Sequence, residues 1–364
     1  MPKPAIHGTA ECLGAAMSNI SHKQENIIDI MQRAITRRPP RRRAGLRAAL
    51  MVAALFAMSG ASAAQDAPPA SAALELLVLG SGGPGATGRA GAAYSVLLDG
   101  KPRILVDAGP GAFVRAGEAR LPFADMDIVL LTHLHADHAG GLPGLIKARA
   151  VSACGKIAFH VFGPSASKGG QTREGDVDAA FPSTSRFIDL MFGKQGAFSY
   201  LRDFSAPVTF KTTDLFTHPK AGAAPLIIVN QDGLVIRAIA GHHRDAPAVI
   251  YRIDYKGKSI TFSGDIDPLG HAALRSIAKD SQLLVLNAVV LDPPKSPQVL
   301  YTLHTAPQDI GRIASDAGVG GLLLSHISPV IDAQREAVTA SIRQAYQGPV
   351  QFAEDGLRVP LTRP

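Results

Sequence analysis

The stretch DIVLLTHLHADHAGGLPGL, residues 127–145, passes from an apolar run into imidazole and carboxylate side chains and then back into small and apolar residues. Its first part, 127–132, has the length and composition of a buried strand. The next six residues contain four groups that commonly bind metals, His133, His135, Asp137 and His138. Burying so many polar groups at a strand end is unfavourable unless a partner compensates them. A bound metal ion is such a partner.

Other ligand-type side chains occupy the same kind of position, directly after an apolar run. His242 and His243 follow LVIRAIAG, Asp265 follows SITFSG, and His326 follows GLLLS. The ends of neighbouring strands meet at one edge of a sheet, so residues far apart in the sequence can converge there. We therefore expect these side chains to join the first loop in one metal site. Strand position alone does not decide between His242 and His243.

Short apolar runs alternate with turns along the rest of the chain. Asp99-Gly100, Asp232-Gly233 and Lys256-Gly257 separate pairs of such runs and predict β-hairpins. Helices are expected over 112–119 and 306–318. Many strands with interspersed helices predict two β-sheets packed face to face with helices outside, in one globular domain.

The N-terminal part has the features of an export leader. RRPPRRRAGLR is positively charged, AALMVAALFAM is apolar but too short to span a bilayer, and SGASAAQ supplies small residues for cleavage near Ala63 or Ala64. Residues 1–30 precede a second start at Met31 and fit an over-extended gene start. The expected organisation is a leader with a signal peptide (1–64), a linker (65–73) and a folded domain (74–364).

The formal charge of +7 lies almost wholly in this leader. Nine of the 37 Lys and Arg residues and three of the 30 Asp and Glu residues fall within 1–64, which leaves 28 against 27 in the remainder. We therefore expect a periplasmic or secreted protein that binds no nucleic acid, and no membrane once the leader is removed. Cys12 lies in the leader, so Cys154 alone can form neither an internal disulfide nor a thiolate zinc site.

Five motifs of the chain resemble those of the metallo-β-lactamase superfamily, in the same order. They are THLHADH, HHRDAPAVIYRI, TFSGD, LHTAPQDIG and LLLSHISP, and the likeness runs from about Leu74 to about Val359. Within the family, the chain is most like the branch of ribonuclease Z, arylsulfatase-like and phosphodiesterase-like hydrolases. The resemblance implies an α/β protein with the αββα metallo-β-lactamase sandwich, in which two mixed β-sheets pack face to face and helices lie outside.

Carried over position by position, the resemblance implies a site for two divalent metal ions. Zinc suits these ligands best, and manganese or iron could replace it. One ion would be held by three histidines, a second by an aspartate and two histidines, and a further aspartate would bridge both. In that order the ligands are His133, His135 and His243; Asp137, His138 and His326; and Asp265.

The resemblance also separates the two adjacent histidines. The family ligand lies four residues before a proline and eight before an aromatic residue, and Pro247 and Tyr251 fit His243. His242 would then lie outside the ligand set.

The same resemblance implies catalytic roles for two residues. A hydroxide bridging the two ions would attack the substrate, and Asp137 would orient it. His304 in LHTAPQDIG takes the position of a histidine that gives a proton to the leaving group in ribonuclease Z-like enzymes. The alternative for His304 is a local hydrogen bond at the start of a helix.

Together these points predict an exported binuclear metallo-hydrolase that cleaves phosphodiester or sulfate ester bonds of a small molecule. Ribonuclease Z itself is disfavoured, because only a short hairpin separates Tyr251 from Asp265 where that enzyme has its tRNA-binding arm, and because an exported protein would not meet tRNA. The alternatives are a lactonase, a β-lactamase-type amide or ester hydrolase, and a non-catalytic metal-binding module. A homodimer is left open.

Residues 165–220 are expected to line the substrate pocket. Their large apolar side chains could accept an aromatic leaving group, and ordinary helix packing is the alternative. These side chains are Phe187, Met191, Phe192, Phe198 and Tyr200.

Overall fold

The structure is a computed structural model that describes residues 72–361, apart from residues 86, 154, 168–180, 205, 218–221, 245 and 293–294. The predicted leader and nearly all of the predicted linker lie outside the described residues, so export stays a prediction. Within the described part of the chain, every helix is too short or too polar to cross a membrane.

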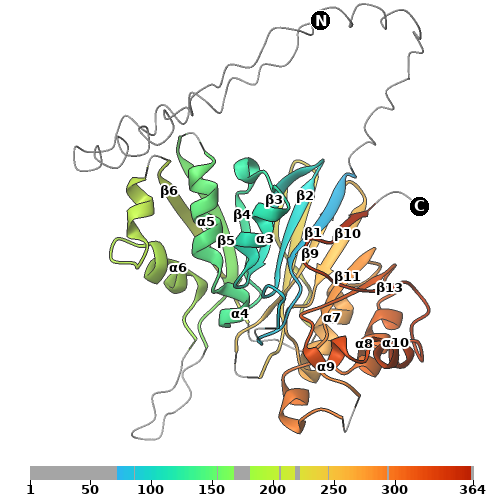
Figure 1. Ribbon diagram of the computed structural model, residues 1–364. Coiled ribbons are helices and arrows are strands. Elements are labelled where there is room, and N and C mark those ends of the chain that lie inside the picture. Colours follow the sequence, from blue (N-terminus) through green and yellow to red (C-terminus); the bar gives the residue numbers. More distant parts are fainter. Residues whose placement is uncertain are drawn as a thin grey trace, which may run out of the picture. The chain divides into compact units, whose positions relative to one another are not determined.

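Two seven-stranded sheets form the centre of the protein (Figure 1). The first has the strand order β14 (Arg358–Leu361), β1 (Leu74–Gly80), β2 (Ala93–Leu98), β3 (Lys101–Ala108), β4 (Ile128–Leu130), β5 (Ile157–Pro164) and β6 (Val208–Leu215). The second has the order β13 (Val350–Phe352), β12 (Leu322–Ser325), β11 (Leu283–Asn287), β10 (Lys258–Phe262), β9 (Val249–Tyr255), β8 (Leu234–Ala240) and β7 (Leu226–Gln231).

Each sheet is antiparallel in one half and parallel in the other. In the first sheet, β14, β1, β2 and β3 pair antiparallel, and β3, β4, β5 and β6 pair parallel. In the second sheet, β7, β8, β9 and β10 pair antiparallel, and β10, β11, β12 and β13 pair parallel. Parallel strands end at the same edge of a sheet, so the loops that follow them meet there.

The predicted hairpin turns are present. Asp99, Asp232 and Lys256 have φ values of 49°, 50° and 48°, and the glycine after each also has a positive φ. Two consecutive residues with positive φ define the tight turn whose twist matches that of the flanking strands. The turn residues read from the sequence therefore set the register of these strand pairs.

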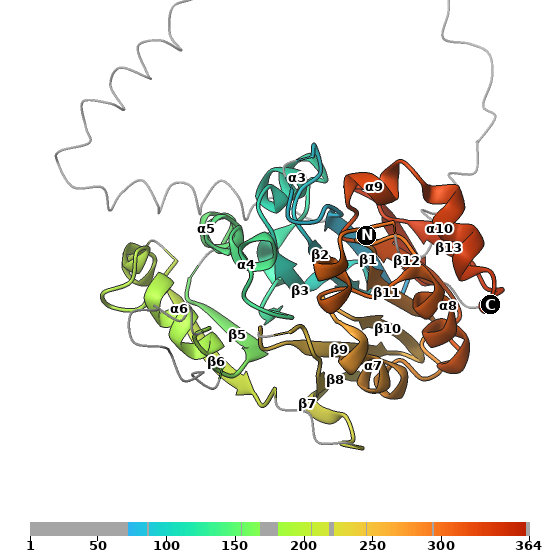
Figure 2. The ribbon, with the colours of Figure 1, turned by 90° about the horizontal axis from the view of Figure 1, so that it is seen from below.

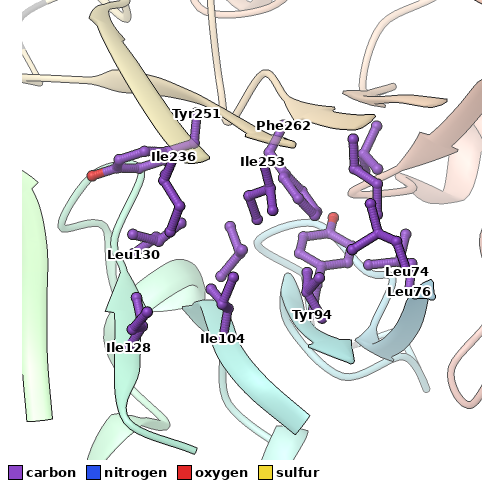
Figure 3. Close-up of a cluster of buried hydrophobic side chains, with 14 of the residues drawn as sticks. Leu74, Leu76, Tyr94, Ile104, Ile128, Leu130, Ile236, Tyr251, Ile253 and Phe262 are labelled. Atoms are coloured by element: carbon purple, nitrogen blue, oxygen red, sulfur yellow. The ribbon is translucent and has the colours of Figure 1, made fainter. Parts of the chain in front are cut away.

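A core of apolar side chains fills the space between the sheets (Figure 3). Ile104, Ile128 and Leu130 of the first sheet face Ile236 and Ile253 of the second. Two hydrogen bonds also connect the sheets. In each, the buried phenol of a tyrosine in one sheet donates to a residue of the other sheet or of the loop directly after it. These bonds run from Tyr94 to Oγ of Ser325 at 2.7 Å and from Tyr251 to the carbonyl of Leu131 at 3.0 Å.

Helices cover the outer face of each sheet (Figure 2). Those over the first sheet are α3 (Ala112–Glu118), α5 (Leu142–Val151) and α6 (Thr184–Phe192). Those over the second sheet are α7 (His271–Ile277), α8 (Pro307–Asp316) and α10 (Arg335–Ile342). The four layers are helix, sheet, sheet and helix, which confirms the predicted αββα sandwich.

Candidate metal centre and active site

The structure brings all seven predicted ligands together at one edge of the two sheets. They form two adjoining groups, and within each group one candidate ligand atom per residue lies within 4.8 Å of the others. The first group is His133, His135, His243 and Asp265, and the second is Asp137, His138 and His326. We call these seven residues the ligand cluster.

Strand ends position the ligand cluster, as the sequence predicted. The loop after β4 carries two of its histidines, and the short helix α4 (Ala136–Ala139) carries Asp137 and His138. The second sheet supplies the rest from the residues after β8, β10 and β12. Gly264 and His326 have φ values of 57° and 54°, so the chain turns sharply where it delivers Asp265 and His326.

Asp265 lies between the two groups. Its Oδ2 is 3.7 Å from Nε2 of His243 and 3.6 Å from Nε2 of His326, which belong to different groups. Its Oδ1 is 3.7 Å from Nε2 of His138 and accepts a hydrogen bond from the side-chain amide of Asn287. This central position is the one that a bridging carboxylate requires.

Asp107 contacts the ligand cluster, and the sequence analysis did not single it out. Its buried carboxylate accepts hydrogen bonds from the backbone N–H and the hydroxyl of Thr132, both at 2.7 Å, and its Oδ2 lies 2.8 Å from Nδ1 of His138. The signal was present, because Asp107 ends the apolar run of β3 just as Asp265 follows that of β10. Through this contact Asp107 orients the ring of His138, a member of the ligand cluster.

Two histidines show that the ligand cluster fits a metal ion. Nδ1 of His243 lies 2.8 Å from the carbonyl oxygen of Leu303, and a carbonyl can only accept, so Nδ1 carries the proton. Nε2 of His243 then carries a lone pair directed at the carboxylate of Asp265. Nε2 of His138 is buried and has no hydrogen-bond partner among the described residues. The lone pair of His243 faces a carboxylate, an arrangement that becomes favourable when a metal ion lies between the two.

The electrostatics of the ligand cluster also favour a cation. Burial lowers the pKa of His138, but the carboxylates of Asp265 and Asp107 outweigh it and raise that pKa to about 9. Burial would likewise raise the pKa of Asp265, but the surrounding histidines, His326 first among them, hold it well below its usual range. The carboxylates of Asp265 and Asp107 therefore stabilise positive charge at His138, as they would stabilise a bound cation.

His242 lies outside the ligand cluster. Its Nδ1 is 2.6 Å from Oδ2 of Asp267, and 28% of the side chain is exposed. Asp267 also accepts hydrogen bonds from the backbone N–H groups of Arg244 and Leu269. The structure therefore brings His243, and not His242, into the predicted site.

His304 lies beside the ligand cluster. Its buried Nδ1 is 3.9 Å from Oδ2 of Asp265 and has no hydrogen-bond partner among the described residues. Burial lowers the pKa of His304 to about 4, although Asp265 raises it in part. The ring is therefore close enough to reach a group bound at the ligand cluster, and it is neutral at pH 7 in the free protein.

Four of the five side chains expected to line a substrate pocket pack into or against the apolar core instead. Phe192 is buried in the core between the first sheet and its helices, and Phe187, Met191 and Phe198 pack against that core. Tyr200 is 51% exposed, and its ring lies 5.0 Å from the ammonium of Lys147. The structure supports the alternative of ordinary packing for four of these five residues.

The fold and the ligand cluster define the class of protein. Residues 88–303 match the Metallo-beta-lactamase superfamily, which covers more than half of the chain, and the chain belongs to this family. A cluster of histidines and aspartates in this fold is a site for divalent metal, and the family supports the expectation of a metallo-hydrolase.

Two relatives found by sequence carry the same name. The chain is 28% identical over 301 residues to ribonuclease Z of Mycobacterium avium, an alignment that covers 80% of this chain and 99% of the relative. It is 27% identical over 305 residues to ribonuclease Z of Mycobacterium marinum, with 79% and 98% covered. These alignments support the predicted resemblance to the ribonuclease Z branch.

Solved structures share the fold. The short form of human tRNase Z has a TM-score of 0.59 and 20% identity, with 79% of this chain and 100% of that chain covered. The metallo-beta-lactamase fold protein YhfI from Bacillus subtilis has a TM-score of 0.56 and 18% identity, with 79% and 98% covered.

These relatives overturn two expectations about the substrate. The first is that the enzyme hydrolyses small-molecule phosphodiesters or sulfate esters, and the second is that it has no nucleic-acid partner. The relatives are ribonucleases by name, and the chain spans nearly their whole length. The expectations failed because they relied on features outside the ligand cluster. These features are the short hairpin of β9 and β10 and the near-zero net charge after the leader. Neither determines which chemical bond the ligand cluster can cleave.

Proposed function

We propose that the protein is a metal-dependent ribonuclease of the ribonuclease Z type, which hydrolyses a phosphodiester bond of RNA. The observation that carries the proposal is the complete ligand cluster, centred on Asp265, in a chain that matches ribonuclease Z relatives along 98–99% of their length. Two adjacent metal ions can stabilise both the attacking and the leaving oxygen of a phosphodiester, and a carboxylate shared between two ligand groups can hold such a pair.

The residues present would hold two ions, most suitably zinc, with manganese or iron as substitutes. His133, His135 and His243 would hold one, Asp137, His138 and His326 the other, and Asp265 both. When bound, such ions supply an activated water molecule and neutralise the negative charge of the phosphodiester.

The side chains around the ions have separate tasks. Asp137 is partly exposed at the open side of the ligand cluster, where its carboxylate can accept a hydrogen bond from the attacking water and orient it. His304 lies on the side of Asp265, within reach of a leaving oxygen. A bound phosphodiester places negative charge beside His304, which raises its pKa and favours the protonated form that can donate to that oxygen.

The test uses the purified full chain, loaded with zinc or manganese, and a stem-containing RNA with a 3′ extension. We expect endonucleolytic cleavage that stops on addition of EDTA and yields a phosphate monoester on one product and a hydroxyl on the other. A water nucleophile leaves no 2′,3′-cyclic phosphate, and its absence distinguishes this activity from a contaminating metal-independent ribonuclease.

Two variants complete the test. Asp265→Asn should abolish cleavage, because it removes the shared carboxylate. Asp127→Asn alters a surface carboxylate paired with Arg103, and cleavage should continue unchanged. If the metal-loaded protein leaves the RNA intact, or if cleavage survives in Asp265→Asn, the proposed function is wrong.

A further inference from the structure

The ligand cluster is open to solvent on one side. His133, His138, His243 and His326 are buried, whereas the ring of His135 is only partly buried. Asp137 is partly exposed as well. A substrate therefore reaches the ligand cluster along the side formed by His135 and Asp137.

An aromatic ring lies on this open side. The centroids of the Phe181 and His135 rings are 5.4 Å apart, with an angle of 54° between the ring planes. Among the described residues, Phe181 is the one phenylalanine or tyrosine whose ring contacts a histidine of the ligand cluster. Phe181 is also partly exposed.

The backbone of Phe181 is held in place. Its N–H donates to Oγ of Ser167 at 3.0 Å, and its carbonyl accepts a hydrogen bond from the N–H of Ser167 at 3.2 Å. Two residues later, Ser183 caps helix α6 by accepting a hydrogen bond from the N–H of Arg186. These hydrogen bonds therefore fix the backbone position of Phe181, which lies between the end of β5 and the start of α6.

Packing alone does not account for the position of this ring. Phe187 and Phe198, which follow it along the chain, pack against the core between the first sheet and its helices. Phe181 instead turns towards His135 and leaves part of its surface in solvent. What sets Phe181 apart from other exposed aromatic side chains is that its ring lies against a histidine of the ligand cluster.

We propose that Phe181 stacks against a nucleobase next to the phosphodiester that is cleaved, an inference that rests on the proposed function. A phosphodiester held at the ligand cluster would bring a neighbouring base to its open side, where the Phe181 ring lies 5.4 Å from that of His135. Aromatic side chains bind single-stranded nucleotides by stacking, with little dependence on the identity of the base. Phe181 would thus contribute to binding and orientation rather than to the chemical step.

The chain offers a direct spectroscopic test, because it contains no tryptophan. Phe181→Trp introduces one tryptophan at the proposed contact, and its indole can be excited selectively over the six tyrosines. Stopped-flow mixing of the zinc-loaded variant with single-stranded RNA should quench its fluorescence before turnover begins. Tyr200→Trp is the matched control, since Tyr200 is exposed and precedes the amino end of β6, whereas the ligand cluster lies at the carboxyl ends of the strands. Its fluorescence should stay constant.

Kinetics supply the second test. Phe181→Leu keeps an apolar side chain but removes the π surface, and its KM for RNA should rise roughly 10- to 100-fold with kcat nearly unchanged. Phe181→Tyr should restore the wild-type KM. On an RNA with an abasic nucleotide at the stacked position, wild type and Phe181→Leu should have the same KM.

The outcomes separate this inference from the proposed function. If the wild-type protein does not cleave RNA, the proposed function fails and the stacking role fails with it. If RNA is cleaved while the fluorescence of Trp at position 181 does not change, the stacking role is wrong and the proposed function stands. Equal losses of Phe181→Leu on normal and abasic RNA, or a loss of bound metal, would also overturn the stacking role.

Discussion

Oδ2 of Asp107 and Nδ1 of His138 lie 2.8 Å apart, and both side chains are buried. Because Asp107 accepts from Nδ1, the other ring nitrogen of His138 is left free to bind a metal ion. Thr132 binds the same carboxylate through its N–H and its hydroxyl, so the loop that carries the first histidines is fixed by the same residue. Asp107 connects the end of β3 to the ligand cluster.

Replacing this carboxylate should weaken metal binding without unfolding the protein. Asp107 has a φ of 54°, a conformation that asparagine tolerates well, so Asp107→Asn removes the charge with little backbone strain. Residues that orient a metal-bound histidine typically change metal affinity by about 10- to 100-fold. Competition titration with a zinc chelator should show a loss of this size.

Asp127→Asn is the control, because it removes a carboxylate on the surface that pairs with Arg103. Its zinc affinity should equal that of the wild type. A wild-type zinc affinity in Asp107→Asn would show that Asp107 only supports the loop.

Protons should compete with metal for His138. The raised pKa of about 9 means that His138 is protonated at pH 7 in the metal-free protein, and a metal ion must displace this proton. Metal affinity should therefore rise by about tenfold per pH unit as the pH increases from 6 towards 9, and level off above it. Calorimetric titration in buffers of different ionisation enthalpy measures the released proton. No proton release at pH 7 would contradict the raised pKa.

The sequence predicts much of the fold because its signals are local. Turn pairs such as Asp99-Gly100 fix hairpins through backbone conformation, and apolar runs mark strands whatever lies beside them. The position after apolar strands singled out the candidate ligands, and the resemblance to the metallo-β-lactamase superfamily reduced them to the seven, with His243 rather than His242 among them. A single aspartate such as Asp107 carries the same signal, but it has no neighbouring histidine to reinforce it.

What the sequence could not predict depends on contacts between distant segments. Phe181 is one of several aromatic residues in its region, and only its approach to His135 separates it from those that pack. The substrate was predicted wrongly because the argument used features outside the ligand cluster. A short hairpin between β9 and β10 limits where an RNA could be held, but it leaves the bond-cleaving site unchanged.

The central position of Asp265 predicts the number of ions. Wild-type protein purified without chelator and saturated with zinc should contain about two ions per chain. Asp265→Asn should retain at most one, because the ligands of both groups then lose their shared carboxylate. Elemental analysis gives the stoichiometry. A wild-type content that stays at one would argue against the bridging role.

Arg89 should be important for stability, because it ties the glycine-rich loop after β1 to the C-terminal part of the chain. Its side chain is only 11% exposed and contacts Asp332, Glu354, Oγ of Ser81 and the carbonyl of Ala353. Arg335 also binds Asp332 and Glu354, so Arg89→Ala removes one of their two donors together with the contacts to Ser81 and Ala353. The substitution should lower the free energy of unfolding by about 2 kcal/mol.

Arg186→Ala is the matched control for Arg89. Arg186 pairs with Asp189 on the surface of α6 and is 60% exposed, so its loss should change stability by less than about 0.5 kcal/mol. Denaturant unfolding measures both variants. Equal stabilities would mean that solvent replaces the contacts of Arg89.

The last prediction separates leaving-group chemistry from metal binding at His304. His304→Ala should keep the wild-type metal content, because both groups of ligand atoms are complete without His304. If His304 protonates the leaving oxygen, the variant should cleave RNA roughly 10²- to 10⁴-fold more slowly. With the test compound bis(4-nitrophenyl) phosphate, whose leaving group needs no proton, the loss should be small.

The pH dependence of RNA cleavage gives a second, independent test of the role of His304. Burial holds its pKa at about 4, so the protonated fraction grows as the pH falls from 8 towards 5. With metal occupancy held constant by excess zinc, the difference in RNA cleavage between wild type and His304→Ala should therefore widen as the pH falls. Asp137→Ala should slow both substrates alike at every pH, because the orientation of the attacking water does not depend on the leaving group. A uniform defect of His304→Ala on both substrates would assign the ring to substrate positioning instead.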